Sequence, residues 1–325
     1  MKILITGANG FIGSHLLRYF SGMKEHFTCG LVRKTSDLSR LADGNYHLVI
    51  ASLQDPLEGL LAGFDAVIHT AALSLDWGDY RDFYRSNVEG SVRLLRAARR
   101  SGVKRFIHLS STVVYGFGGN RMTEEDRPFD PFPNPYCLTK VRAEEKLKSS
   151  ASGIELVILR PSNVIGPDDL TTTYPLIRAI KKGMIAFPAG GRYLTSPCSV
   201  KNLVAAVDAA LTAPEASGEA FNISDGNDIT WKDLLALIAE KAGGRAPRFS
   251  IPLGLLRKAA GIMEKIYLLR RSSVPPIITP YRIAQVAADY SFSIDKARSR
   301  LGYDPPFTTE DEIERSVAWY NRLAG

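Results

Sequence analysis

The sequence predicts an α/β fold with a doubly wound parallel sheet, followed by a smaller and mostly helical C-terminal lobe. Two features carry this prediction. Through the first half, short runs of Val, Ile and Leu alternate with longer stretches of helical periodicity, a pattern typical of parallel strands that helices cover on both faces. A glycine-rich turn also joins the first of these runs to the first helical stretch, which is how such sheets commonly begin.

The first half of the chain contains apolar runs short enough to be strands and longer stretches with helical spacing. The strands are expected at 2–6, 27–33, 46–51, 65–69, 104–109 and 154–159, and the helices at 11–20, 80–101 and 135–150. Right-handed crossovers between parallel strands then give a Rossmann-type arrangement.

The turn after the first strand has the spacing Gly-x-x-Gly-x-x-Gly, with Gly7, Gly10 and Gly13. Gly7 suits a tight turn, Gly10 lets the backbone approach a pyrophosphate, and Gly13 lets the helix pack on the strand. Phe11 and Ile12 open the helix, whose unpaired N–H groups and partial positive charge favour phosphate. Because the turn follows a strand and begins a helix, it predicts a dinucleotide site rather than an ordinary connection.

The end of the second strand indicates which dinucleotide binds. An NAD site would usually place Asp or Glu there to bind the ribose 2′-hydroxyl. This chain has Arg33 and Lys34 instead, and its next carboxylate is Asp37. A guanidinium pairs well with a 2′-phosphate, so we favour NADP over NAD. The alternative is a solvated basic turn without a ligand.

Tyr136 and Lys140 stand four residues apart at the start of the helix at 135–150, which places both side chains on one face. A neighbouring ammonium and a cationic nicotinamide both favour the phenolate, so we expect the pKa of Tyr136 to be lowered by ~3 units. Ser111 follows the strand at 104–109, at the sheet edge where ligands bind. Its hydroxyl would hold a substrate oxygen against the phenol.

The amino-acid composition changes after Arg160-Pro161, where Pro and Gly become frequent and loops are expected between the helices. Helices are expected at 201–212, 231–242 and 309–323. We therefore divide the chain into residues 1–165, a dinucleotide-binding Rossmann domain, and residues 166–325, mainly a substrate-binding lobe with some segments that return to the first domain.

The composition excludes several classes of protein. Of 325 residues, 45% are hydrophobic and 23% charged, which excludes disordered and collagen-like chains. The formal charge of +7 suits an anionic cofactor but is too dispersed to indicate nucleic acid. The three cysteines lie far apart and show no metal-ligand spacing, so we expect neither disulfides nor a metal site. Because residues 2–6 already read as a strand and no run approaches ~20 apolar residues, a cytoplasmic location is expected.

Several motifs in order resemble the extended short-chain dehydrogenase/reductases, the NAD-dependent epimerase/dehydratase superfamily. These motifs are the glycine turn at 6–13, Val67-Ile68-His69-Thr70-Ala71-Ala72, Asn87-Val88-Glu89-Gly90, Ser110-Ser111 through Tyr115-Gly116, Tyr136 with Lys140, and 159–167. The tail at 292–303 and the stretch ending in Asn202 are similar to the 3β-hydroxysteroid dehydrogenase-like branch.

The resemblance implies that Ser111, Tyr136 and Lys140 form the catalytic set, with Lys140 also holding the nicotinamide ribose. It further implies that the cofactor is lined by residues after the third, fourth and later strands, namely Leu53, Ala71, Ala72, Asn87, Pro161, Asn163 and Val164. Leu53 stands in a stretch where relatives often carry Asp-Leu beside the adenine. The resemblance also implies a homodimer through the helices at 80–101 and 135–150.

Departures from the family pattern narrow the range of reactions that we expect. Sugar-nucleotide dehydratases place an acidic pair just after the catalytic Ser or Thr, where this chain has Thr112 and Val113. Nucleotide-sugar epimerases commonly carry an arginine in the stretch that corresponds to 195–202, which has none, although Arg192 is near. Asn163, by contrast, matches a position where epimerases bind the sugar nucleotide.

We therefore expect an NADP-dependent oxidoreductase that interconverts a secondary alcohol and a ketone on a largely apolar small molecule, 3β-hydroxysteroid-like or 3-oxoacyl-derived. The alternative is a nucleotide-sugar epimerase with tightly held NAD(P). A third class, a non-catalytic dinucleotide sensor, has no need of the Ser/Tyr/Lys set.

The segment 253–271 combines basic and apolar residues. A helix there with Leu253, Leu256, Ala260, Met263 and Ile266 on one side could pack on the core with a solvated basic face. It could also cover an apolar substrate pocket, or make a weak contact with an anionic membrane surface.

Overall fold

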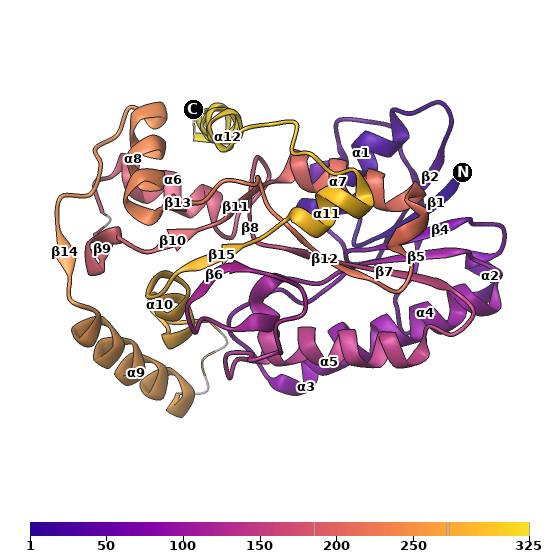
Figure 1. Cartoon of the computed structure of the whole chain (residues 1–325), viewed down its shortest axis with the longest axis horizontal. Coiled ribbons are helices and arrows are strands. Elements are labelled where there is room, and N and C mark those ends of the chain that lie inside the picture. Colours follow the sequence, from indigo (N-terminus) through magenta and orange to yellow (C-terminus); the bar gives the residue numbers. More distant parts are fainter. Residues whose placement is uncertain (185, 271, 273, 325) are drawn as a thin grey trace.

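The computed structural model describes residues 1–184, 186–270, 272 and 274–324. A seven-stranded parallel sheet lies at the centre of the first domain, in the order β3-β2-β1-β4-β5-β7-β12 (Figure 1). Its strands are β1 (Lys2–Thr6), β2 (Phe27–Val32), β3 (His47–Ile50), β4 (Ala66–His69), β5 (Arg105–Leu109), β7 (Glu155–Pro161) and β12 (Ala220–Ile223). The six strands expected from the apolar runs are confirmed, as is the Rossmann-type order.

Helices cover both faces of this sheet (Figure 1). On one face lie α1 (Phe11–Ser21), α7 (Val200–Thr212) and α11 (Asp295–Leu301), and on the other α2 (Glu58–Leu61), α4 (Gly90–Arg100) and α5 (Pro135–Ser150). Both faces are buried, which is why the strands read as continuous apolar runs. The chain returns to this sheet late, because β12 pairs with β7 and α11 packs on the same core as α1.

The segment 80–101 differs from the single regular helix expected there. It consists of α3 (Tyr80–Phe83), a π-helical turn η2 (Tyr84–Glu89) and α4. A π turn adds a residue to the helical repeat and so turns the following side chains to a new angle. Asn87 lies within it and points its amide to the loop after β4, with which it forms two hydrogen bonds.

The C-terminal lobe packs small sheets against a bundle of helices (Figure 1). The sheets are formed by β6 (Asn120–Thr123), β10 (Leu194–Thr195), β13 (Ile229–Thr230) and β15 (Tyr290–Phe292), by β8 (Asn163–Ile165) with β11 (Pro197–Ser199), and by β9 (Phe187–Pro188) with β14 (Ser250–Ile251). The bundle consists of α6 (Thr173–Lys181), α8 (Trp231–Ala242) and α12 (Thr309–Ala324). The helices expected in this half are present.

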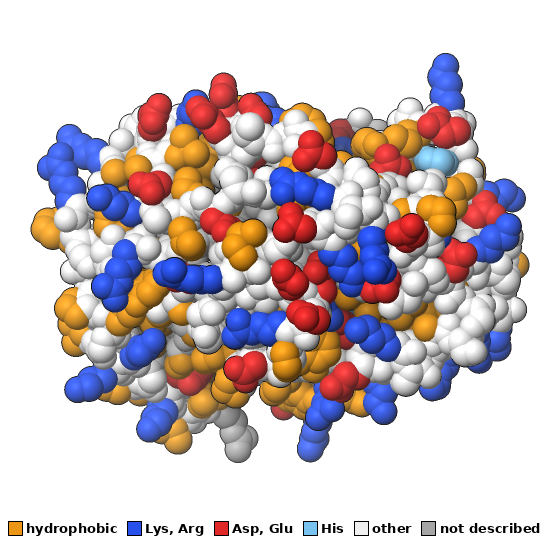
Figure 2. Space-filling view, viewed as in Figure 1, with side chains coloured by type: hydrophobic (Ala, Val, Ile, Leu, Met, Phe, Trp, Pro, Cys, Tyr) orange, Lys and Arg blue, Asp and Glu red, His pale blue; other side chains and the backbone are white. Residues whose placement is uncertain are grey.

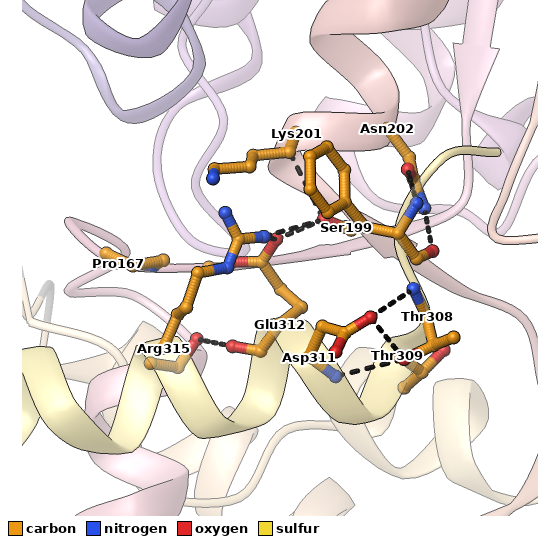
Figure 3. A network of polar contacts seen from close by, with 12 residues as sticks. Pro167, Ser199, Lys201, Asn202, Thr308, Thr309, Asp311, Glu312 and Arg315 are labelled. Atoms are coloured by element: carbon orange, nitrogen blue, oxygen red, sulfur yellow. Dashed lines mark hydrogen bonds and ion pairs between the residues drawn. The ribbon is translucent and has the colours of Figure 1, made fainter.

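A buried polar network ties α12 to the start of α7 (Figure 3). The Asp225 carboxylate accepts hydrogen bonds from Asn202 Nδ2 at 2.7 Å and from Thr309 Oγ1 at 2.8 Å. The fully buried Glu312 accepts a hydrogen bond from the Ser199 hydroxyl at the end of β11. Because β11 pairs with β8, this network supports the back of the strand that enters the predicted site.

The helix α9 (Leu253–Leu269) and the short α10 (Pro280–Val286) form a hairpin at the edge of the lobe (Figure 1). Of the side singled out in the sequence, Leu253, Leu256 and Ala260 pack against α10, a helix that the sequence analysis did not predict. Ile266 does not belong to that packed side, because 41% of its surface is exposed. The side that packs is decided by the position of α10, which the helical periodicity of α9 alone does not give. Within the described ranges, no helix is both long and apolar enough to cross a bilayer.

Candidate active site

The loops after β1 and β4 approach each other closely at the carboxyl edge of the sheet, where doubly wound folds have their ligand crevice. Strand order reverses between β1 and β4, and ligands of such sheets bind at that point. Gly7 has φ +68°, and a Cβ there would lie 2.8 Å from the backbone of Ala71 in the opposite loop, next to Ala72. A Cβ on Gly13 would lie 2.1 Å from the Gly7 carbonyl oxygen. Both contacts require glycine.

The N-terminus of α1 faces this crevice with unused donors. Gly10 is the residue before the helix, and its N–H donates to the Gly7 carbonyl at 2.9 Å. No described side chain caps this end of α1, so the first amides, those of Phe11, Ile12 and Gly13, keep their N–H groups for a ligand. Together with the helix dipole they form a site suited to a pyrophosphate.

The loop after β2 lines the outer rim of the crevice. Arg33 and Lys34 are exposed, and the backbone N–H of Arg33 donates to Ser36 Oγ at 3.0 Å. The nearest carboxylate, Asp37, is already engaged, because it accepts hydrogen bonds from Ser39 N–H at 2.9 Å and Ser39 Oγ at 3.0 Å. The rim therefore offers cations and a hydroxyl where a ribose-binding carboxylate would stand.

Ser111, Tyr136 and Lys140 come together at the carboxyl end of β5. Tyr136 is the second residue of α5, and Lys140 Nζ lies 5.8 Å from the centre of its ring. Lys140 is buried and donates to the Leu109 carbonyl at 2.7 Å. Ser111 is the residue before the short helix η3 (Thr112–Tyr115), and its oxygen accepts the Val113 N–H at 3.3 Å. Its hydroxyl also forms a hydrogen bond with the Tyr136 phenol.

The electrostatics of this group differ from the expectation. Burial raises the pKa of Tyr136 above its usual range, and a hydrogen bond with Ser111 opposes the rise only in part. Burial lowers the pKa of Lys140 to about 8, with Glu144 acting in the opposite sense. The expected lowering of the Tyr136 pKa is wrong for the protein by itself, because desolvation of the phenolate is the largest influence on this pKa. Tyr136 is thus a protonated donor at neutral pH.

A buried ion pair, which sequence reasoning missed, holds α5 against the sheet. Glu144 accepts hydrogen bonds from Arg160 Nε at 3.0 Å and Arg160 Nη2 at 2.7 Å, and both side chains are almost fully buried. Ser110 Oγ donates to the same carboxylate at 2.5 Å. Glu144 is one turn beyond Lys140 and Ser110 precedes Ser111, so this pair fixes the spacing between the predicted catalytic groups. Because Glu144 and Arg160 lie on different elements, their spacing along the chain gives no signal for this pair.

The side-chain amide of Asn87, a predicted cofactor residue, forms hydrogen bonds within the protein. Its Oδ1 accepts the Leu73 N–H at 2.7 Å, and its Nδ2 donates to the Leu73 carbonyl at 3.0 Å and to Thr139 Oγ1 at 3.1 Å. Asn87 therefore shapes the loop after β4 and joins it to α5. Leu53 packs against Gly90 at the start of α4.

The residues expected from the motif at 159–167 line the side of the site that faces the lobe. Pro161 ends β7, and its carbonyl accepts from Thr112 Oγ1 at 3.4 Å. Asn163 and Val164 begin β8. Asn163 Nδ2 donates to Thr195 Oγ1 at 2.7 Å, so one donor of this amide is already used within the protein.

Two other residues near the site are structural, as expected. His69 is buried and its two ring nitrogens contact Thr6 Oγ1 at 2.7 Å and Ser91 Oγ at 2.8 Å. Burial raises the pKa of Cys137 to about 12, which keeps its thiol protonated and unreactive. Over the described part of the chain, no cluster of three His, Cys, Asp or Glu side chains could hold a metal ion.

Aromatic side chains beside Tyr136 form an apolar wall that the sequence analysis did not identify. Tyr281 of α10 lies near Tyr136 and Cys137, and its ring centre is 6.1 Å from that of Phe132 and 5.6 Å from that of Phe117. A cavity of about 460 Å³ lies against this wall. Its lining is mainly apolar and includes Phe117, Phe132, Ile283, Ala284 and Ala287, and its charged members are Asp130 and Arg257 of α9.

Comparison with known proteins places this geometry in context. A sequence model of the NAD dependent epimerase/dehydratase family matches residues 3–224. A 4-hydroxy-2-methyl-3-oxo-4-farnesyl-3,4-dihydroquinoline-1-oxide ketoreductase of Stigmatella aurantiaca is 30% identical, over 97% of this chain and 95% of that protein. A 3 beta-hydroxysteroid dehydrogenase/Delta 5-->4-isomerase of Mycobacterium tuberculosis is 29% identical, over 99% and 91%. The structure of a UDP-glucuronic acid 4-epimerase from Bacillus cereus in complex with NAD has a TM-score of 0.80 at 23% identity, and the match covers all of both chains.

Proposed function

The chain belongs to the NAD-dependent epimerase/dehydratase family, an NAD(P)-dependent group of enzymes, and we propose that it is an NADP-dependent oxidoreductase. Its reaction interconverts a secondary alcohol and a ketone on a largely apolar substrate, 3β-hydroxysteroid-like or 3-oxoacyl-derived. The observation that carries this proposal is the protonated Tyr136 phenol beside the Ser111 hydroxyl. Phe117 and Phe132, which belong to the aromatic wall beside Tyr136, also line a mainly apolar cavity. We propose that the hydrocarbon body of a ketone substrate lies along these aromatic side chains, with its carbonyl oxygen at the Tyr136 and Ser111 hydroxyls.

Each residue of the set has a separate task in ketone reduction. NADPH held at the glycine turn and the N-terminus of α1 would supply the hydride for the carbonyl carbon and would leave as NADP⁺. Ser111 donates a hydrogen bond to the carbonyl oxygen, and Tyr136 transfers its phenolic proton to that oxygen, so the ketone becomes an alcohol. The phenolate that remains is stabilised by the Lys140 ammonium until a proton returns from solvent. Lys140, with its pKa lowered to about 8, is mostly charged at neutral pH and can perform that task.

The cofactor preference rests on the rim of the crevice. Arg33 and Lys34 are exposed and stand where the 2′ substituent of the adenosine ribose would lie. Asp37 is occupied by Ser39 and so does not compete for a ribose hydroxyl. A 2′-phosphate would receive the Arg33 guanidinium and the Ser36 hydroxyl, which is the donor set that phosphate prefers.

The substrate class rests on the wall formed by Phe117, Phe132 and Tyr281 and on the cavity beside it. The names of two relatives point the same way, because one is a ketoreductase of a farnesylated quinoline and the other a hydroxysteroid dehydrogenase. Large apolar bodies gain binding energy from buried area, which a cavity of this kind supplies.

A nucleotide-sugar epimerase is the second candidate, and Asn163 favours it. Its position matches the one where epimerases of the family bind the sugar nucleotide. However, Asn163 Nδ2 is bonded to Thr195, and the nearby Asp228 carboxylate adds a negative charge close to Ser196 and Ser291. A diphosphate is repelled by a carboxylate at that place. We therefore rank this function second.

One pair of assays separates the two candidates. The purified protein is given NADPH with a long-chain 3-oxo ester or a 3-ketosteroid, and the loss of the reduced-nicotinamide absorbance is followed. It is also incubated with UDP-glucose, and UDP-galactose is measured. Stoichiometric NADPH oxidation with a ketone supports the proposal. Sugar conversion without net change in the cofactor, together with no ketone-dependent oxidation, contradicts it.

We also propose a homodimer in which α4 and α5 of two copies pack together, and a location in the cytoplasm. The first follows from the family resemblance. The second is supported by the three cysteines, which are unpaired and buried, the state that a reducing compartment maintains. Light scattering tests the assembly: twice the chain mass is expected, and a particle of one chain mass contradicts the dimer.

A further inference from the structure

The outward side of α9 is an apolar stripe that nothing in the described chain covers. Leu255, Ile262, Ile266 and Leu269 recur at spacings of seven, four and three residues, so they share one face of the helix. Their side chains are 62%, 60%, 41% and 86% exposed. The opposite face, around Ala260, packs on α10. The helix is therefore apolar on the side where a surface helix is normally polar.

This stripe belongs to a larger concentration of exposed apolar side chains. Of the nineteen large hydrophobic side chains that are exposed in the described chain, eight lie between Phe249 and Ile277, a stretch of 29 residues. Scattered exposed leucines need no explanation, but a contiguous patch marks a surface that binds something.

Cations accompany the apolar stripe. Residues 245–270 contain six basic residues and a single acidic one, Glu264. Lys258 and Lys265 follow Leu255 and Ile262 by three residues, which places them along the edge of the stripe, and both are exposed. In Figure 2, hydrophobic and basic side chains lie side by side over the corner occupied by α9.

We propose that α9 is an interfacial helix, by which the protein rests on the surface of an anionic lipid bilayer. An apolar face flanked by Lys and Arg lies in the plane of such a surface, with the leucines and isoleucines among the acyl chains and the cations beside lipid phosphates. A second copy of this chain is a poorer occupant, because a twofold contact along this stripe would bring Lys258 and Lys265 close to their own counterparts.

The position of α9 connects this surface to the site. Arg257, one turn along from Leu253, reaches the edge of the 460 Å³ cavity, whose other walls include α10 and Phe132. A lipophilic molecule that leaves the bilayer at α9 would meet this cavity before the aromatic wall and Tyr136.

Two contacts also fix the hairpin of α9 and α10 to the loop after β4. Trp77 Nε1 donates to the Ser272 carbonyl at 2.9 Å, and Arg282 Nε forms an ion pair with Asp76 at 2.6 Å. Asn134, which caps α5 next to Tyr136, donates to the Asp76 carbonyl at 2.9 Å. Because the hairpin is held in this way, binding at α9 would orient the cavity toward the bilayer.

Co-sedimentation of the whole protein with vesicles tests the proposal. We expect binding to vesicles of equal phosphatidylcholine and phosphatidylglycerol, weaker binding to phosphatidylcholine alone, and weaker binding at high salt. The double variants Ile262→Ser/Leu269→Ser and Lys258→Glu/Lys265→Glu should each lower the partition coefficient at least about tenfold. These side chains are exposed, so thermal unfolding should be unchanged and serves as the check of folding.

Matched variants elsewhere on the surface make the test specific. Leu170→Ser/Leu323→Ser removes exposed apolar side chains, and Lys24→Glu/Lys104→Glu reverses the same number of exposed charges outside α9. Both controls should bind vesicles like the parent protein. Absence of binding to anionic vesicles, or equal loss in controls and α9 variants, would overturn the proposal. So would an α9 variant that dissociates a dimer while its vesicle binding stays intact, because a second copy would then cover the stripe.

Discussion

The helices α5 and α9 have similar lengths and opposite relations to water. α5 buries polar and charged residues, among them Lys140 and Glu144, whereas α9 buries Ala260 and exposes most of its leucines and isoleucines. Apolar content therefore does not decide which helix is inside. A buried charge and an exposed apolar patch are both costly arrangements that mark function. In α5 the cost is offset by partners, and in α9 we propose that a lipid surface offsets it.

The largest expected effect tests whether Tyr136 of α5 is the proton donor of the reaction. Tyr136→Phe removes the proton donor but keeps the ring and its packing, so we expect turnover with NADPH and ketone to fall about 10³-fold, within the usual range for general acid catalysis. Cofactor affinity, measured by fluorescence titration, should stay within twofold. Tyr80→Phe on the exposed α3 is the control and should be active. A Tyr136→Phe enzyme with parental turnover would refute the mechanism.

The next effect concerns the charges inside α5. Glu144→Gln leaves the Arg160 guanidinium buried without a counter-charge, and we expect the free energy of unfolding to fall by about 3 kcal/mol. The neighbouring Glu145 pairs with Arg142 at the surface, where both side chains are about half exposed, so Glu145→Gln should cost at most about 1 kcal/mol. Chemical denaturation measures both. If both variants lost the same free energy of unfolding, burial of the Glu144–Arg160 pair would not increase its contribution to stability.

A smaller effect is expected at the exposed rim of the crevice. Arg33→Asp exchanges the cation that we propose for the 2′-phosphate for a carboxylate, so NADPH affinity should fall about 10- to 100-fold, the equivalent of one hydrogen-bonded charge pair. NADH affinity should change little, and Lys24→Asp, exposed elsewhere, should change neither. If NADPH and NADH lost affinity equally, the rim would not be the determinant of cofactor choice.

The pH dependence tests Lys140, whose pKa burial lowers to about 8. The charged form stabilises the phenolate, and it is lost as pH rises through that value. We therefore expect kcat/KM for ketone reduction to be level below about pH 7 and to fall about tenfold by pH 9. Lys140→Arg keeps its charge over this range, so its profile should lack the fall even if its rate is lower. If kcat/KM of the parent protein and of Lys140→Arg fell over the same pH range, titration of Lys140 would not be the cause of the fall.

Much of this architecture could be predicted from the sequence, because its signals are local. Six strands and the glycine turn follow from short apolar runs and from the spacing of Gly7, Gly10 and Gly13, and Tyr136, Lys140 and Ser111 are indeed close in space. β12 was missed because a strand of only four residues, all of them buried and one of them the polar Asn222, gives almost no periodic signal. It is recognisable only by its partner, β7.

What could not be predicted depends on contacts between distant segments. The partners of Asn87 and Glu144 lie on other elements, so their spacing along the chain does not show whether they hold a ligand or the protein itself. The pKa of Tyr136 depends on how much water surrounds it, which a sequence does not report. Likewise, α10 rather than periodicity decides that Ile266 faces outward.

The smallest expected effect brings the two helices into one experiment. Leu255→Ala on α9 removes a side chain that is 62% exposed, so the free energy of unfolding should change by less than about 0.5 kcal/mol. The same truncation on α5, Leu147→Ala, opens a cavity in the core against β7, because Leu147 is fully buried among apolar neighbours. It should cost about 3 kcal/mol. Urea unfolding without lipid measures both. A cost at Leu255 close to that at Leu147 would mean that the stripe is covered within the protein, which would remove the reason to look for a lipid surface.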